Sequence, residues 1–369
     1  MVGNLWQMRI LFLNSIGSKK WGGGEKWMLM TAAGLQAKGH EVVIGCAPRS
    51  VICQNAMAKG LSVAPLSFKT DFDVPGFFRL LSVLKQERIE IVVCGQNKDT
   101  KIAAVAARLL GGVSVIARHG LQLIRKKWKY KFIFTKWIQG VITNSASIKS
   151  EYDGYGWFAQ DFVKVIYNGY TAPENVTAFD FRSHFALSED ALVIVSTGRL
   201  AKQKGYEVLI EAAEMARDQC KNWVFFVAGR GKLEKKLKRK VKASHLSGYV
   251  HFLGFIADVV PYVKGADLFV LPSFYEGMPN SVMEAMGLGK CCVVSAVNGN
   301  NELIRNDREG LLIKPGDARA LYEGIEKIAD DPRAAKEMGL NALKRMSETF
   351  SEKQMIDGVE AFLKSKINA

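Results

Sequence analysis

The feature that most constrains this chain is the alternation of short, strongly apolar runs with longer amphipathic stretches. Continuous apolar strands separated by helices are typical of parallel sheets that helices cover on both faces. The sequence therefore predicts an α/β fold. The runs, which are rich in Val and Ile, lie at 9–14, 41–46, 89–94, 113–119, 140–145 and 163–168, and then at 191–197, 223–229, 250–255, 267–273, 291–296 and 310–315.

The series of runs completes one set and starts again near Leu192. Because 369 residues exceed what one ordinary core fills, we expect two doubly wound, Rossmann-like domains. Ligands of such folds bind beyond the carboxyl ends of the strands, so the site is expected in a cleft between the domains. We place the first domain at 1–172, the second at 173–348, and a final helix at 349–369 that packs back on the first domain.

The formal net charge of +15 favours anionic partners, namely nucleic acids, phosphorylated small molecules or an acidic membrane face. Charge alone does not choose among them.

No apolar run reaches the ~20 residues that a transmembrane helix needs, and the first residues lack the pattern of a secretion signal. The six cysteines show neither a C-x-x-C pair nor zinc spacing, which predicts a reducing cytosol and no structural metal.

The first candidate site is the glycine loop in NSIGSKKWGGGEKWMLM, which contains Gly23 and Gly24. Glycines let a backbone approach a ligand closely, and the N-terminus of the following helix favours an anion. The loop is not G-x-G-x-x-G, and the run at 41–46 ends without the acidic residue that would hold a ribose, which argues against a dinucleotide. The alternative is a turn that only needs glycine.

The second candidate is the basic loop in STGRLAKQKGYEVLIEA, with Arg199, Lys202 and Lys204. Arg offers a planar fork for phosphate oxygens and Lys a mobile point charge, so cations beside a helix start suit a diphosphate. The alternative is a solvated basic loop.

The third candidate is SFYEGMPNSVMEAMGLGK, at 273–290, which sets Glu276 and Glu284 on either side of a turn. We expect Pro279 as the first helical residue and Glu284 one to two turns into the helix. A carboxylate so placed accepts hydrogen bonds from two vicinal hydroxyls, as a ribose presents them. The backbone N–H groups of Met278, Asn280 and Ser281 would lie at the positive helix end. The alternative is a pair of acids, one complementing the helix dipole and one on the surface.

Two further features lie in the first half. His119 ends the run at 113–119 and would face the same cleft, unless it is a structural histidine. The segment from Ile124 to Trp137, IRKKWKYKFIFTKW, alternates basic and aromatic residues. That pattern suits an anionic membrane interface or single-stranded nucleic acid. The alternative is a helix whose aromatic residues pack inward while its lysines stay in water.

Taken together and in this order, these residues resemble the retaining glycosyltransferases of family four, which have the two-domain GT-B fold. The resemblance is strongest from Ser196 to Asp317 and weaker but continuous over the first half. The motifs that carry it are G-R-L-x-x-x-K-G, F-L-G-F, A-D-L-F-V-L-P-S-x-x-E-G-x-P-N-S-x-x-E-A-M, G-x-x-E-L-I and G-L-L-I-x-P-G-D.

The resemblance implies a role for each candidate residue. Glu276 would contact the donor sugar, Glu284 the ribose hydroxyls, Arg199 and Lys204 the diphosphate, and the backbone at Ile256 the nucleobase. The remaining positions it implies are His119 near the donor sugar, Gly23 and Gly24 in the phosphate and acceptor loop, and Met278, Pro279 and Asn280 in the donor-binding turn.

The activity implied is metal-independent, retaining transfer of a hexose-type sugar from a nucleotide-diphosphate sugar, with UDP favoured over GDP and no other cofactor. The acceptor would be a cell-envelope glycan or lipid-linked molecule such as lipopolysaccharide core. Departures from the family pattern, such as Cys291-Cys292 after Gly-Lys, leave the donor open.

The resemblance also implies a cytoplasmic protein that lies peripherally on the inner membrane, through Ile124 to Trp137. The alternatives are a sugar-nucleotide epimerase on the same fold and a non-catalytic nucleotide- or membrane-binding protein. A nucleic-acid partner is not expected, because the sequence shows no recognised nucleic-acid motif.

Overall fold

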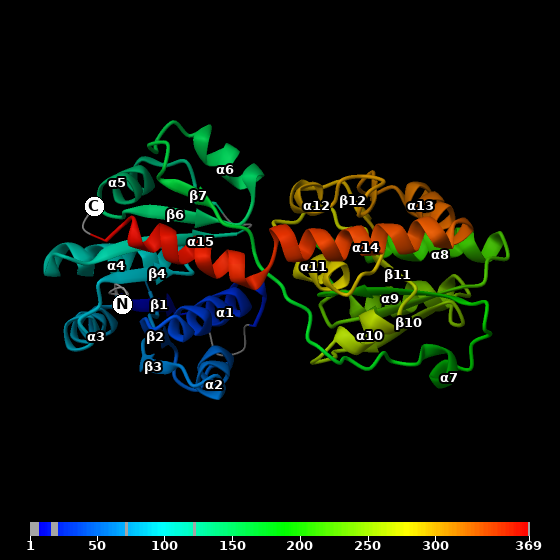
Figure 1. The fold of residues 1–369 in the computed structure, drawn as a ribbon, viewed down its shortest axis with the longest axis horizontal. Coiled ribbons are helices and arrows are strands. Elements are labelled where there is room, and N and C mark those ends of the chain that lie inside the picture. Colours follow the sequence, from blue (N-terminus) through cyan, green and yellow to red (C-terminus); the bar gives the residue numbers. More distant parts are fainter. Residues whose placement is uncertain (1–6, 16–20, 71–72, 121–122, 368–369) are drawn as a thin grey trace, which may run out of the picture. The chain divides into compact units, whose positions relative to one another are not determined.

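The computed structural model describes residues 7–15, 21–70, 73–120 and 123–367 (Figure 1). The chain divides into two compact units, one formed by Met1–Gly169 with Glu352–Ala369 and the other by Tyr170–Ser351. The sequence analysis set its boundaries a few residues away, after residues 172 and 348. Each unit is a parallel sheet with helices on both faces, which confirms the prediction of two doubly wound domains.

The first unit contains a seven-stranded sheet in the order β3-β2-β1-β4-β5-β6-β7. Strand β3 escaped the sequence analysis, because this short edge strand buries only one of its four residues. The strands are β1 Arg9–Asn14, β2 Glu41–Cys46, β3 Ser62–Pro65, β4 Ile91–Cys94, β5 Ser114–His119, β6 Gly140–Thr143 and β7 Val163–Val165. The helices are α1 Gly23–Ala37, α2 Val51–Ala58, α3 Val74–Gln86, α4 Asn97–Leu110, α5 Trp128–Lys136, α6 Ala146–Asp153 and α15 Glu352–Lys364.

Alternation along β1 shows how this sheet is buried on both sides. Ile10 and Phe12 join the core under α1, α2 and α15, whereas Leu11 and Leu13 join the core under α3 to α6. Successive side chains of a strand point to opposite faces, so a continuous apolar run fills two cores.

The second unit contains a six-stranded sheet in the order β10-β9-β8-β11-β12-β13. All six of its strands coincide with apolar runs found in the sequence. They are β8 Leu192–Thr197, β9 Trp223–Ala228, β10 Val250–Gly254, β11 Leu268–Leu271, β12 Cys292–Ser295 and β13 Gly310–Ile313. The helices are α7 Phe181–Phe185, the 3-10 turn η1 Lys202–Lys204, α8 Tyr206–Asp218, α9 Glu234–Ala243, α10 Val260–Gly265, α11 Asn280–Gly287, α12 Asn298–Leu303, α13 Ala318–Asp330 and α14 Pro332–Thr349.

Both sheets reverse their winding direction once. In the first unit the order turns at β1 and β4, and in the second at β8 and β11. In doubly wound sheets the crevice at such a switch point, beyond the carboxyl ends of the strands, is where ligands bind. Each unit therefore has one edge at which functional residues are expected.

Helix α15 returns the chain to the first unit and lies along α1 (Figure 1). Gly34 makes this packing close, since a Cβ there would lie 2.2 Å from Cδ1 of Ile356. At the other end of the contact Glu360 accepts from Lys38, from Nε2 of His40 at 3.2 Å and from Lys364 at 2.5 Å. Apolar packing and a charged cluster both hold α15 in place.

Among the residues that the structure describes, no helix is both long enough and apolar enough to span a bilayer.

We expect the Glu360 cluster to make stability fall in acid. Its hydrogen bonds lower the pKa of Glu360 from 4.5 to about 2, although burial opposes the shift. As the pH falls from about 4.5 to about 2, Glu360 becomes protonated in the unfolded chain but stays ionised in the folded chain. The stabilisation that its ionised form provides is therefore complete above this window and is lost within it. Glu360→Gln should lower the free energy of unfolding by on the order of 2 kcal/mol at neutral pH and flatten its pH dependence in the window. Urea unfolding at several pH values measures both. Glu337→Gln, at an exposed site on α14, is the control. If the free energy of unfolding changed with pH equally in both variants, Glu360 would not be the source of the acid dependence.

Candidate functional site

The loops that follow β8 and β11 meet at the switch point of the second unit. Gly205 has φ +67°, and a Cβ there would lie only 1.9 Å from the carbonyl oxygen of Pro272. No other residue type fits a left-handed conformation with backbone packed against it so closely. The glycine after Lys204 thus lets the β8 loop press against the β11 loop.

An ion pair joins these two loops. Nζ of Lys204 lies 2.7 Å from Oε1 of Glu276, and Oγ of Ser273 donates to the same oxygen at 2.7 Å. The side chain of Glu276 is 7% exposed and that of Lys204 is 15% exposed. Removing one partner would leave a buried, unpaired charge, which makes the pair interdependent. The structure thus brings together two residues that lie 72 positions apart in the sequence.

Gln203 connects the ion pair to Arg199. Its Nε2 donates to the carbonyl oxygen of Tyr275 at 2.9 Å and to Oε2 of Glu276 at 3.4 Å, while its Oε1 accepts from Nη2 of Arg199 at 3.4 Å. The Arg199 side chain is exposed, so its fork remains open to solvent. Sequence analysis passed over Gln203 and Ser273, although both lie inside the stretches that it singled out.

Helix α11 places the second carboxylate. Pro279 is its N-cap, and the helix begins at Asn280, one residue later than expected. No side chain caps the helix start, and its first internal bonds run from Val282 and Met283 to the carbonyl oxygen of Pro279. Glu284 lies in the second turn and is partly exposed. Met278, just before the helix, is buried.

Ile256 follows β10 and is partly buried. Beside it Phe255 is 62% exposed, with the guanidinium of Arg230 lying 5.8 Å from its ring centroid. This pair stands at the carboxyl ends of β9 and β10, and β9 pairs with β8, whose following loop carries Arg199. A nucleobase subsite here would have an apolar face and a cation.

In the first unit the histidine at the end of β5 is buried and its ring is held by a tyrosine. The Tyr152 hydroxyl accepts from the amide of Ile124 at 3.2 Å, so its own proton points to Nδ1 of His119 at 2.6 Å. Burial, and then the charge of Arg118, lower the pKa of His119 to about 3. His119 is therefore neutral near pH 7, and we assign its proton to Nε2 because Nδ1 faces the Tyr152 hydroxyl. Nε2 is buried without a hydrogen-bond partner among the described residues, which leaves a donor for a ligand oxygen.

The glycine loop leads directly into α1, which begins at Gly23 after the N-cap Gly22 and has no side-chain cap. Gly24 faces Nη1 of Arg118, since a Cβ at Gly24 would lie 3.7 Å from that atom. The loop residues 16–20, which belong to the same sequence feature, lie outside the described residues.

The basic aromatic segment divides between the core and the surface. Ile124 and Phe134 are buried, whereas Trp128 is 84% exposed and Phe132 is 50% exposed, with its ring edge-on to Trp137. The expectation of an exposed aromatic surface and the alternative of inward packing each describe part of the segment.

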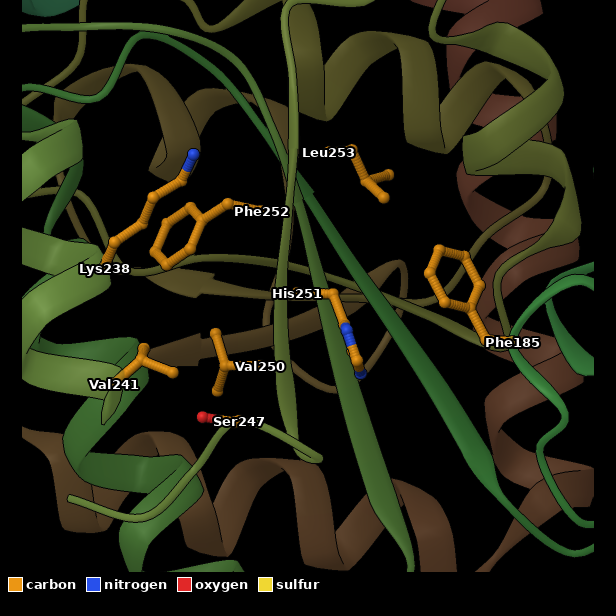
Figure 2. Close-up of a pocket in the computed structure, with 8 residues that line it drawn as sticks. All are labelled: Phe185, Lys238, Val241, Ser247, Val250, His251, Phe252 and Leu253. Carbon is orange, nitrogen blue, oxygen red and sulfur yellow. The ribbon is translucent and has the colours of Figure 1, made fainter. Parts of the chain in front are cut away.

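A hollow of about 290 Å³ lies at the open edge of the second sheet (Figure 2). Figure 2 shows Phe252 and Lys238 on one side of β10 and His251 and Phe185 on the other. His251 stacks on Phe226, with ring centroids 5.1 Å apart. The hollow contains none of the candidate site residues, although Phe252 and Leu253 of the F-L-G-F motif line it.

Within the described parts of the chain, no three His, Cys, Asp or Glu side chains gather as metal ligands would.

The comparisons with known proteins bear on this arrangement of two doubly wound sheets with charged loops at a switch point. The family model for glycosyl transferases group 1 matches residues 178–345, and the model for Glycosyltransferase Family 4 matches residues 21–172. The chain belongs to this glycosyltransferase family, and it is a transferase with the GT-B fold.

Individual relatives agree with that placement. The UDP-Gal:alpha-D-GlcNAc-diphosphoundecaprenol alpha-1,3-galactosyltransferase of Escherichia coli is 28% identical over 78% of each chain. A Campylobacter jejuni alpha-1,4-N-acetyl-D-galactosaminyltransferase, named for a GalNAc-GalNAc-diNAcBac-PP-undecaprenol acceptor, is 27% identical over 92% of this chain and 94% of its own. Anabaena HepE, solved with UDP and glucose, is 21% identical with a TM-score of 0.83, covering 97% of this chain and 100% of HepE, and shows the same fold.

We predict that Tyr152 fixes the tautomer of His119. Tyr152→Phe removes the hydroxyl that pairs with Nδ1 in the described chain, so the Nε2–H form should lose its preference and stability should fall by about 1 kcal/mol. Long-range 15N–1H NMR of the histidine ring at neutral pH distinguishes the tautomers. Tyr155→Phe is the matched control, because Tyr155 donates to the carbonyl oxygen of Ile124 and leaves the His119 bond intact. A ring that stays purely Nε2–H in Tyr152→Phe would show that another group sets the tautomer.

Proposed function

We propose that the second unit binds a nucleotide-diphosphate sugar and that the protein transfers its hexose-type sugar with retention of configuration. The observation that carries the proposal is the Lys204–Glu276 ion pair, with the exposed fork of Arg199 beside it. These residues occupy the motif positions that the family resemblance gives to the diphosphate and to the donor sugar.

The proposed chemistry follows from where charge develops. Cleaving the bond between sugar and diphosphate places negative charge on the leaving group. Arg199, Lys204 and the uncapped start of α11 supply positive charge to it, so we propose a metal-independent reaction. Lys204 has three donor protons, and only one of them points at Glu276. It can therefore bind a phosphate oxygen while it still holds the carboxylate that touches the sugar.

Retention of configuration is proposed on the family resemblance and is compatible with this geometry. The Glu276 carboxylate is fixed by three donors, from Lys204, Ser273 and Gln203. A carboxylate held in this way suits orientation of the donor sugar. We propose that the leaving phosphate then helps to deprotonate the acceptor on the same face of the sugar.

The names of relatives support a choice of substrates. The Escherichia coli relative is named for a UDP-galactose donor and a diphosphoundecaprenol acceptor, and the Campylobacter relative for a PP-undecaprenol acceptor. A Rhizobium meliloti relative is named for lipopolysaccharide core biosynthesis. We propose a UDP-sugar donor and a lipid-linked, cell-envelope acceptor.

A lipid-linked acceptor would require access to a membrane, and the first unit has a suitable surface. Helices α3, α4 and α5 cover one face of its sheet, and most of the exposed large apolar side chains of this unit lie on them. Those side chains are Val74, Phe78, Val105, Leu109, Trp128 and Phe132. Lysines on and just before α5 accompany them, which is the composition of an anionic membrane interface. We propose peripheral binding to the cytoplasmic leaflet through this face.

The donor proposal predicts stabilisation by one nucleotide. At about a hundred times its dissociation constant, UDP should add about 2.7 kcal/mol to the free energy of unfolding. Chemical denaturation with UDP, GDP, ADP and CMP measures this. Glu284→Ala should abolish the gain, because it removes the carboxylate assigned to the ribose, while Glu323→Ala at an exposed site on α13 should keep it. Equal stabilisation of wild type and Glu284→Ala would show that Glu284 does not bind the ribose. Stabilisation by GDP alone would mean that the donor nucleotide carries guanine in place of uracil.

The membrane proposal predicts segment-specific liposome binding. Lys126→Glu, Lys127→Glu and Lys131→Glu together should weaken binding to phosphatidylserine vesicles by at least about tenfold, since each lysine near the surface contributes about 1 kcal/mol. Trp128→Ser with Phe132→Ser should weaken it as well, but with little salt dependence. The matched control makes the same charge change at Lys232, Lys235 and Lys242, which are exposed at α9 of the second unit. Co-sedimentation measures the binding, and equal losses for the two charge-reversal variants would mean that only net charge matters.

A further inference from the structure

Arg118 is a guanidinium that the proposed mechanism does not use. It lies one residue before His119 on β5 and points to the opposite face of the sheet, toward α1. Its Cζ lies 4.7 Å from the centroid of the Trp27 ring, and its Nη2 donates to Oδ1 of Asn168 at 3.1 Å. The side chain is therefore held in a fixed orientation at the carboxyl edge of the first sheet.

The hydrogen-bonding capacity of this guanidinium is only partly used. Among the described residues Arg118 forms no ion pair, and neither Nε nor Nη1 makes a hydrogen bond. The carboxylate whose charge it senses is Glu25, which is buried and accepts from Nδ2 of Asn14 at 3.3 Å. Burial lowers the pKa of Arg118 to about 10, so the group stays charged at neutral pH.

The backbone beside the open side of the fork carries no side chain at two positions. A Cβ at Gly120 would lie 3.3 Å from Nη1, and one at Gly24 would lie 3.7 Å from it. Two glycines thus border the same nitrogen. The start of α1, which no side chain caps, adds its positive end at Gly24. The carboxylate of Glu25, in the first turn of α1, partly balances these positive charges.

Other buried polar atoms at this edge also lack partners. Burying such groups without a hydrogen bond costs about 1–3 kcal/mol each, so several of them on neighbouring elements indicate a place that a ligand completes. At this edge the buried polar atoms without a partner in the described chain include Trp27 Nε1, Arg118 Nε, His119 Nε2, Thr143 Oγ1 and Asn144 Oδ1.

We propose that Arg118 binds the diphosphate group of the lipid-linked acceptor. This inference rests on the proposed function and adds a residue and a recognised group to it. Arg is the side chain best suited to phosphate oxygens, because it offers several donors in one plane. The diphosphate of the donor already has Arg199 and Lys204 in the second unit, so a separate guanidinium in the first unit suits a separate anion.

The test uses farnesyl diphosphate as a short-chain probe, with farnesol and inorganic pyrophosphate as its two halves. Calorimetric titrations of the full-length protein are made with saturating UDP, so that the donor site is occupied. Wild type should bind farnesyl diphosphate more tightly than either half. Arg118→Gln should weaken that binding about tenfold to a hundredfold, as expected for lost hydrogen bonds to a charged group, and should leave farnesol binding unchanged. Arg118→Lys keeps the charge but loses the planar guanidinium, so its affinity for farnesyl diphosphate should lie between those of wild type and Arg118→Gln.

Controls separate the outcomes. Arg108→Gln, at an exposed site on α4, makes the same change of charge and should bind like wild type. Unfolding curves check that both Arg118 variants fold, and the lysine variant keeps the test informative if the glutamine variant does not. The affinity for UDP should be the same in all variants.

Three results would overturn the inference. Undiminished binding of farnesyl diphosphate by Arg118→Gln would remove Arg118 from the site. A loss of UDP affinity in that variant, with farnesyl diphosphate unaffected, would assign the guanidinium to the donor. Arg118-dependent binding of pyrophosphate alone would identify a site for a free anion. Failure of wild type to bind UDP would instead count against the proposed function, while binding of farnesyl diphosphate would still be measured.

Discussion

The ion pair between Lys204 and Glu276 depends on two loops lying in direct backbone contact, and most features of the second unit make that contact possible. Gly205 supplies the left-handed conformation and the missing side chain that let its loop reach Pro272. The switch point supplies the geometry, since β8 and β11 are neighbours in the sheet although β9 and β10 separate them in the sequence. A buried ion pair is weak support for stability, because desolvation of two charges offsets their attraction. Under the proposed function the pair instead presents charge to a ligand.

The same winding gives the two sheets different chemistry at their edges. In the second unit the loops after β8 and β11 carry an exposed arginine, two lysines and Glu276, and α11 adds Glu284, which together suit a ligand with a diphosphate and several hydroxyls. In the first unit the corresponding edge offers a neutral histidine, His119, and the buried guanidinium of Arg118. Neutral donors suit hydroxyl groups, and one guanidinium suits one anionic group. The fold provides two similar parallel sheets, and the residues at the strand ends decide what each sheet can bind.

The sequence predicts the strands and helices better than it predicts the side-chain contacts between them. Apolar runs identify β8 to β13, most of whose residues are buried, whereas β3 is missed because only one of its four residues is buried. Motif spacing locates Arg199, Lys204, Glu276 and Glu284 on the correct loops and helix. It does not show that Gln203 connects Arg199 to Glu276, nor that Tyr152 holds His119, since those bonds join elements whose approach only the folded chain determines. Pro279 is misplaced by one residue, because proline suits the N-cap as well as the first turn.

Strand alternation gives the end of β5 two separate roles. Arg118 and His119 are adjacent in the sequence, yet one packs on Trp27 of α1 and the other on Phe134 and Tyr152 of α5 and α6. They still influence each other, because the charge of Arg118 helps to lower the pKa of His119. Burial, with the charge of Arg118 adding to it, keeps the histidine neutral, and a neutral imidazole with its proton on Nε2 would donate a hydrogen bond without adding a second positive charge. Under the two proposals, this one strand end would hold the acceptor diphosphate on one face and a hydroxyl of the donor sugar on the other, because its two last side chains point to opposite faces of the sheet.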